Sequence, residues 1–171
     1  METVDQYQLR VSIFEHSKVD PNQVHLDPEA IKKIEDAGRL TDIRPMLIQD
    51  TREQNGFGLL FKGPCVIEGL PVGDYSVAGL QDRIAIERKS LSDLVGSLTH
   101  DRQRFERELA KARSYQFFAV VVEGSAQAIL RGDYGRSEAN PKAVWESVAA
   151  FNARYCPFHF LGDRRTAAAW T

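Results

Sequence analysis

Alternation of apolar and polar residues indicates several short strands along the chain. Residues 8–14 alternate in this way, and a short apolar stretch at 45–50 leads into charged residues and a glycine-rich loop. The stretches 72–77 and 83–89 also have strand character, and the sequence AGLQD at 78–82 between them is typical of a turn. These two stretches are therefore expected to form an antiparallel hairpin.

The predicted hairpin brings two acidic residues together. If its turn is centred just after Leu80, antiparallel pairing places Asp74 opposite Glu87, with about 5 Å between the two Cβ atoms. Because side chains alternate along a strand, Glu87 and Lys89 share one face and Arg88 lies on the other. The charged triplet is therefore not a single uniform patch.

A helical pattern begins directly after the hairpin. Ser90 and Asp93 have the spacing of a capping box. The apolar stripe that follows is formed by Leu91, Leu94, Val95 and Leu98. A second helix is predicted over about 100–115, and its inward residues are Phe105, Leu109 and Ala112. A separate basic stripe on this helix is formed by Arg104, Arg107 and Lys111.

The later part of the chain alternates strands with helices. The apolar run FFAVVV at 117–122 is typical of a parallel strand buried on both faces. After a loop over 132–140, Asn140 and Pro141 are suited to start a helix, and PFHFL at 157–161 predicts one more strand before an alanine-rich helix. We therefore expect an α/β fold, with a mixed central sheet flanked by helices.

Residues 1–45 are expected to form an amino-terminal extension, a strand and a short helix packed on the core. Asp27 and Pro28 provide the helix start, and Gly38 provides its end. The remaining residues, 46–171, are assigned to a single domain, because 171 residues suit one domain with its own core.

Composition excludes several classes of protein. A hydrophobic content of 43% and a charged content of 27% are ordinary for a globular protein, and no apolar run could span a bilayer. The start METVDQYQLR lacks the features of a secretory signal, and Cys65 and Cys156 have neither metal-binding nor redox spacing. We expect a cytoplasmic, nucleoid or nuclear protein that is not secreted and has no membrane partner. Its net charge of −2 means that any basic surface is local.

The facing carboxylates of Asp74 and Glu87 indicate a metal site. Two ionised carboxylates at this distance repel each other, so one takes a raised pKa unless a cation compensates. Magnesium prefers oxygen ligands, and an incomplete set of two leaves positions for water and a substrate phosphate. Lys89 on the same face can stabilise a developing negative charge. This combination is suited to phosphodiester hydrolysis.

The order of these residues matches a family pattern. GDY stands at 73–75, ERK at 87–89, and Asp93 follows after three further residues. In this pattern the chain resembles the XPF-type (ERK-motif) structure-specific endonucleases, a branch of the restriction-endonuclease-like PD-(D/E)xK nucleases. The resemblance covers about 46–122 and continues more weakly to about 161.

Two flanking segments extend this resemblance. IQDTREQ resembles the first strand of the family, with its aspartate and arginine at Asp50 and Arg52. SLSDLVGSL followed by Arg102 resembles the helix and the arginine that come after the ERK triplet.

The resemblance implies a restriction-endonuclease-like fold and an XPF-type nuclease domain over 46–171. The implied function is a metal-dependent DNA endonuclease acting at branched, flap or junction structures, as in DNA repair and recombination. Its cofactor would be Mg²⁺ or Mn²⁺, bound by Asp74 and Glu87. The candidate catalytic residues are Asp74, Glu87, Lys89, Arg88, Asp93 and Asp50, with Lys89 as the catalytic lysine and Asp50 as an accessory acid. The candidate DNA contacts are Arg52, Arg102 and Arg104. Relatives commonly work as dimers, so a homodimer or a partner subunit is also implied.

Two other functions stay open. The sequence has no glycine-rich helix-hairpin-helix pair after the nuclease core, the module with which many relatives grip branched DNA. One alternative is a noncatalytic DNA-binding or partner-binding module with a nuclease fold, against which the intact Asp74, Glu87 and Lys89 argue. The other is a nuclease of RNA or of simple linear ends.

Each of these residues also has a purely structural interpretation. Asp93 can cap a helix, and Arg88 can pair with a buried acid. Asp50, Arg52 and Glu53 can form an ordinary solvated strand end. The basic stripe favours a solvated helix face, because glutamates interrupt it. The histidines show no ligand spacing and are interpreted as structural; they are His16, His25, His100 and His159.

Overall fold

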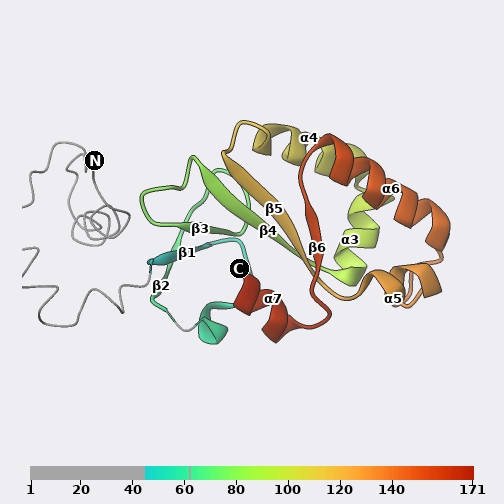
Figure 1. The fold of residues 1–171 in the computed structure, drawn as a ribbon, viewed down its shortest axis with the longest axis horizontal. Helices are drawn as coiled ribbons and strands as arrows, with labels where there is room; N and C mark the ends of the chain where they lie inside the picture. Colours follow the sequence, from blue (N-terminus) through green and yellow to red (C-terminus); the bar gives the residue numbers. More distant parts are fainter. Residues whose placement is uncertain (1–44, 62) are drawn as a thin grey trace, which may run out of the picture.

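The computed structural model describes residues 45–61 and 63–171 (Figure 1). The strand predicted at 8–14 and the helix predicted between Asp27 and Gly38 lie outside these residues, as does nearly all of the expected extension.

A six-stranded mixed sheet forms the centre of the molecule, in the order β2-β1-β3-β4-β5-β6. Its strands are β1 Leu47–Asp50, β2 Cys65–Glu68, β3 Tyr75–Val77, β4 Ile84–Ser90, β5 Phe117–Glu123 and β6 Phe158–Phe160. Strand β3 runs antiparallel to both β1 and β4, whereas the pairs β1–β2, β4–β5 and β5–β6 are parallel. The predicted α/β fold with a mixed sheet is confirmed.

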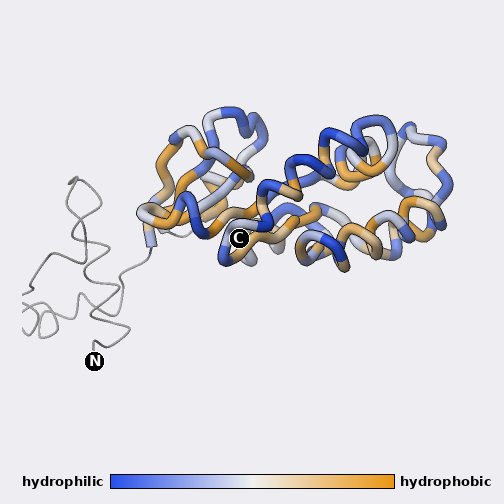
Figure 2. Tube along the Cα trace, turned by 90° about the horizontal axis from the view of Figure 1, so that it is seen from above, coloured by the Kyte–Doolittle hydropathy of each residue, from blue (hydrophilic) through white to orange (hydrophobic). Residues whose placement is uncertain are grey.

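Helices cover both faces of the sheet. They are α3 Leu91–Leu98, α4 Arg102–Ala112, α5 Ala126–Arg131, α6 Pro141–Arg154 and α7 Arg164–Trp170, with a 3₁₀ turn η3 at Gly58–Leu60. Figure 1 shows α3, α4 and α6 together on one side, with α7 near the opposite end of β6. In Figure 2 the hydropathy colours alternate along the helices, as expected of amphipathic helices with one buried face.

Alternation along β5 separates two of the three clusters of the core, and the third cluster contains Ile48, Leu70 and Ala78. Val120 and Val122 belong to the larger cluster, which is built with apolar residues of α3, α4 and α6. Val121 points to the smaller cluster, where it joins Phe57 and Ala167 of α7. Because β5 is buried on both faces, it is the central parallel strand that its apolar run predicted.

The hairpin of β3 and β4 has the predicted register. Tyr75 pairs with Ile86, which places Asp74 opposite Glu87. The strand begins at Tyr75 rather than at residue 72, because Gly73 adopts a left-handed conformation with φ of 77°. A Cβ atom at Gly73 would lie 3.0 Å from the carbonyl oxygen of Ile86, so both the dihedral and the close approach require glycine.

Two elements were absent from the sequence interpretation. Strand β2 lies at the edge of the sheet, where Val66 and Ile67 are exposed, so it lacks the alternation of a half-buried strand. Helix α5 has six residues, too few to establish a helical period. Among the residues described, no helix combines the length and the apolar character needed to cross a membrane.

Candidate active site

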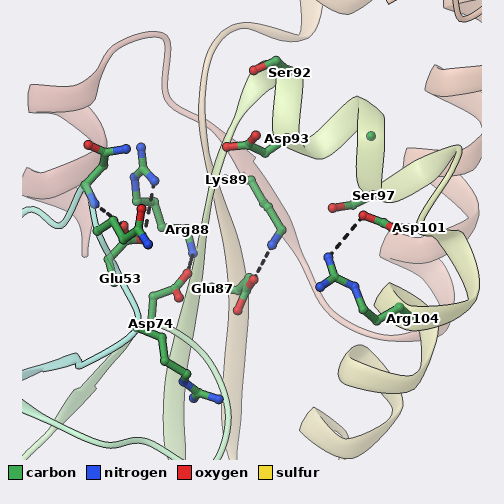
Figure 3. A pocket seen from close by; sticks show the side chains of 14 residues that line it. Glu53, Asp74, Glu87, Arg88, Lys89, Ser92, Asp93, Ser97, Asp101 and Arg104 are labelled. Carbon is green, nitrogen blue, oxygen red and sulfur yellow. Dashed lines mark hydrogen bonds and ion pairs between the residues drawn. The ribbon is translucent and has the colours of Figure 1, made fainter.

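A polar cleft opens where β4 meets the start of α3 (Figure 3). Its volume is about 420 Å³. The loop after β1 forms one wall, and α3 with the start of α4 forms the other. The lining residues are Arg52, Glu53, Gln54, Asn55, Asp74, Glu87, Arg88, Lys89, Ser92, Asp93, Gly96, Ser97, Asp101 and Arg104.

Asp74 is fixed in the cleft by the backbone of β4. Its N–H donates to the carbonyl oxygen of Ile86 at 2.8 Å, and its Oδ2 accepts from the N–H of Arg88 at 2.7 Å. Burial and the nearby charge of Glu87 raise the pKa of Asp74 to about 7, although the hydrogen bond from Arg88 opposes this shift. The two carboxylates therefore repel each other, as expected from the hairpin register.

Glu87 and Lys89 form an ion pair on the face of β4 that lines the cleft. Lys89 Nζ lies 2.5 Å from Glu87 Oε1 and 5.3 Å from the ring centre of Phe105. Burial disfavours the charge of Lys89, but attraction by Glu87 outweighs it and raises the pKa of Lys89. Because only 15–16% of each side chain is exposed, these residues are not ordinary solvated charges.

Arg88 points to the opposite face of β4, as predicted. Its Nε donates to Glu123 Oε1 at 2.6 Å, and its Nη1 lies 3.5 Å from Glu53 Oε2. Its guanidinium also lies 5.8 Å from the ring centre of Phe57. The predicted pairing of Arg88 with a buried acid is confirmed, because the side chains of Glu53 and Glu123 are 8% and 14% exposed.

Asp50 is buried behind the cleft rather than in it. Only 1% of its side chain is exposed, and it accepts two hydrogen bonds from the Arg52 guanidinium and one from the N–H of Leu70. Burial would raise the pKa of Asp50, but these hydrogen bonds outweigh burial and lower the pKa. The interpretation of Asp50, Arg52 and Glu53 as a solvated strand end is therefore wrong for Asp50 and Glu53. Asp50 is connected to the cleft only through its hydrogen bonds with Arg52, which lines it.

Asp93 takes part in the cap of α3 and also lies in the candidate site. Ser90 caps α3 by accepting from the N–H of Asp93 at 3.1 Å, and the Ser90 hydroxyl donates to Asp93 Oδ2 at 2.6 Å. The capping prediction is confirmed, and Asp93 also lines the cleft.

The three arginines considered as DNA contacts have different surroundings. Arg52 and Arg104 line the cleft, and their side chains are 71% and 61% exposed. Arg102 is not a lining residue, because its guanidinium donates to Ser147 of α6 at 2.9 Å and lies 4.7 Å from the ring centre of Phe151. Arg102 thus connects α4 with α6 while its side chain remains 37% exposed, and its contact with DNA stays a prediction.

The remaining residues of interest had weak sequence signals. Of the basic stripe, Arg107 and Lys111 do not line the cleft, consistent with a solvated helix face. His159 stacks on Trp170 with ring centres 4.2 Å apart, a structural position, whereas His16 and His25 lie outside the described residues. Glu123 and Arg164, which contact Arg88 or its partner, were missed because nothing in their local sequence distinguishes them.

The donor set in the cleft suits a hard divalent cation. Asp74 and Glu87 provide carboxylate oxygens on the same cleft, and their mutual repulsion would be relieved by a bound cation. Within residues 45–61 and 63–171, no three or more histidine, cysteine, aspartate or glutamate residues converge into a full ligand set. Water and a substrate oxygen would therefore complete the coordination.

Comparison with known proteins connects this geometry with a family. XPF from Aeropyrum pernix in complex with DNA is 26% identical, with a TM-score of 0.59 over 74% of this chain and 61% of that one. A second structure of XPF from Aeropyrum pernix is 27% identical, with a TM-score of 0.58 over the same shares of both chains. The chain thus spans less than two thirds of these XPF chains.

The family assignment rests on a match over most of the chain. No curated protein matches at a significant level. The model of the ERCC4 domain matches residues 49–171, which include every lining residue of the cleft. Together with the two XPF structures, this match confirms the resemblance to XPF-type nucleases seen in the sequence. The chain belongs to the ERCC4 domain family.

Proposed function

We propose that the protein is a metal-dependent DNA endonuclease that hydrolyses phosphodiester bonds at branched, flap or junction structures. The observation that carries this proposal is the convergence of Asp74, Glu87 and Lys89 on a single polar cleft. Membership of the ERCC4 domain family supports the same reaction.

Asp74 and Glu87 are the residues that would hold Mg²⁺ or Mn²⁺. Such an ion, when bound, supplies activation of water and neutralisation of phosphate charge. The N–H of Arg88 keeps the Asp74 carboxylate oriented before any ligand arrives. Lys89 places a positive charge on the same face, where it stabilises the negative charge that develops on the phosphate during hydrolysis.

Arg52 and Arg104 are suited to hold the DNA backbone. They stand on opposite walls of the cleft and remain largely exposed, although each has an acidic partner, Asp50 or Asp101. One of the two similar XPF structures is a complex with DNA, which supports DNA as the substrate here. Because the chain carries a net charge of −2, we propose that a second copy or a partner subunit adds further DNA contacts.

The proposal is tested with labelled flap, splayed-arm, four-way junction and linear DNA, and with one RNA of matched sequence, in the presence of Mg²⁺ or Mn²⁺. We expect wild-type protein to cleave branched DNA and Asp74→Ala to be inactive. Asp133→Ala is the matched control, because Asp133 is exposed, pairs only with Arg131 among described residues and does not line the cleft. DNA binding without metal-dependent cleavage would instead support the noncatalytic module, and preferential cleavage of RNA or linear ends would support the third function.

A further inference from the structure

The acid that holds Arg88 has a second arginine partner. Glu123 Oε1, at the end of β5, accepts from Arg88 Nε at 2.6 Å and from Arg164 Nη1 at 2.9 Å. Arg164 is the first residue of α7, which begins 41 residues after Glu123. The C-terminal helix is thereby connected to the strand that carries Glu87 and Lys89.

Arg164 also contacts the end of the loop after β1, whose residues 52–55 form one wall of the cleft. Its Nη2 donates to the carbonyl oxygen of Gly56 at 2.5 Å, and its guanidinium lies 5.1 Å from the ring centre of Phe57. Phe57 is fully buried and stacks on Tyr75, the residue after Asp74, with ring centres 5.2 Å apart. One guanidinium therefore contacts both the 51–57 loop and the acid that orients Arg88.

Charge balance gives this arrangement a specific consequence. Arg88 faces two poorly exposed carboxylates, those of Glu53 and Glu123. With Arg164 present, two guanidinium groups neutralise these two acids. Without Arg164, the Arg88 guanidinium alone would face both carboxylates. The 51–57 loop would lose its hydrogen bond from Arg164, and the Arg88 side chain would be held less firmly near β4.

We propose that Arg164 is a positioning residue for DNA cleavage. It does not line the cleft, but through Glu123 and Gly56 it holds Arg88 and the 51–57 loop in the arrangement that aligns Asp74, Glu87 and Lys89. This inference rests on the proposed nuclease function, and it gives α7 an indirect role in positioning the residues of the cleft.

The kinetic test compares Arg164→Ala, Arg164→Lys and Arg165→Ala on the DNA that wild-type protein cleaves best. Arg165 is the matched control, because it follows Arg164 in the same helix and its side chain is exposed. We expect Arg164→Ala to lower kcat about tenfold with KM unchanged, since misplacement of catalytic groups acts on the transition state. Arg164→Lys keeps the charge but lacks the planar fork that reaches two acceptors, so its kcat should be intermediate. Arg165→Ala should match wild type.

Hydrogen exchange provides a second measurement that does not require activity. Amides of 51–57 and 87–89 should exchange faster in Arg164→Ala than in Arg165→Ala, whereas amides of α6 should be unchanged. The inference would be overturned if wild type cleaves DNA and Arg164→Ala has the same kcat. It would also be overturned if the amides of Arg164→Ala exchange faster over the whole domain and not only in these two segments. If Arg164→Ala does not fold, the kcat and exchange of Arg164→Lys decide in its place. If wild type cleaves no substrate, the proposed function fails, and the exchange pattern alone shows whether Arg164 holds the cleft.

Discussion

The N–H of Arg88 donates a 2.7 Å hydrogen bond to Oδ2 of Asp74, so the ERK strand itself orients the carboxylate on the neighbouring segment. The side chain of Arg88 meanwhile points away to Glu53 and Glu123 on the opposite face. One residue thus connects both faces of β4. The face that carries Glu87 and Lys89 and the face that carries the Arg88 side chain can therefore be tested separately.

Removal of the Asp74 carboxylate should abolish metal binding. We expect Asp74→Asn to show no Mn²⁺ binding by calorimetry and no cleavage, because the neutral amide oxygen attracts a divalent cation far less than the carboxylate does. The isosteric amide keeps the side-chain shape, so the protein should remain folded. Asp133→Asn is the control, and retention of Mn²⁺ binding by Asp74→Asn would show that the ion is held elsewhere.

Lys89→Ala should separate catalysis from metal binding. We expect cleavage to fall about a hundredfold, because one preorganised positive group is lost from the transition state. Mn²⁺ affinity should change little, since Asp74 and Glu87 remain. Single-turnover cleavage and calorimetry measure the two effects, with Lys111→Ala on the exposed side of α4 as control. A fully active Lys89→Ala would contradict the role given to this lysine.

Arg88→Ala should affect stability as well as activity. Its side chain is 10% exposed and pairs with two acids, so its loss leaves the Glu53 carboxylate without its described arginine partner and Glu123 with Arg164 alone. This should cost about 3 kcal/mol of unfolding free energy. Urea unfolding measures this change. Arg131→Ala, which breaks an exposed ion pair with Asp133, should change stability by less than about 1 kcal/mol. If Arg88→Ala resembles Lys89→Ala in both stability and activity, the assignment of the strand faces is wrong.

Asp50 should make the fold sensitive to acid. Hydrogen bonds from Arg52 and Leu70 overcome the effect of burial and lower the pKa of Asp50 below its ordinary value of 3.8. A lowered pKa in the folded state means that this contribution to stability is present above about pH 4 and is lost as the pH falls further. Urea unfolding between pH 7 and pH 3 should therefore show a smaller loss of stability for Asp50→Asn than for wild type. Equal losses in the two proteins would contradict this account.

DNA binding should depend weakly on salt. With few arginines at the cleft, the slope of log K against log salt should be shallow, and Arg52→Ala or Arg104→Ala should each reduce it by about one. Arg107→Ala, on the same helix as Arg104 but away from the cleft, should leave the slope unchanged. Fluorescence anisotropy with a flap DNA measures these slopes. A steep wild-type slope would reveal a basic surface beyond the cleft, formed by this chain or by an oligomer.

The features of the site that were predicted correctly follow from patterns among residues close together in the sequence. The turn at 78–82 and the two flanking stretches determined which residues face each other, and the observed pairing of Tyr75 with Ile86 confirms that register. Ser90 and Asp93 likewise formed the cap that their spacing predicted. These features follow from periods of two or about 3.6 residues, which a sequence displays directly.

The errors concerned charged residues whose surroundings come from distant segments. The alternative interpretation of Asp50 and Glu53 as solvated is wrong, because Leu70 and Arg88, 20 and 35 residues away, supply their partners. The contact of the Arg102 guanidinium with Ser147, 45 residues later, was likewise not predicted, and the DNA contact of Arg102 stays a prediction. Local sequence does not show whether a charge will be covered by another element.

The sequence by itself determined the α/β class, the facing carboxylates and the two faces of the ERK strand, because backbone periodicity sets all of these locally. Only the tertiary structure decided which charges neutralise Arg88 and how α7 contacts Glu123 and the 51–57 loop. Arg164 and Gly56 are 108 residues apart, and their hydrogen bond exists because the sheet brings the ends of the domain together. Ion pairs and hydrogen bonds depend on distance in space, which no local pattern of residues records.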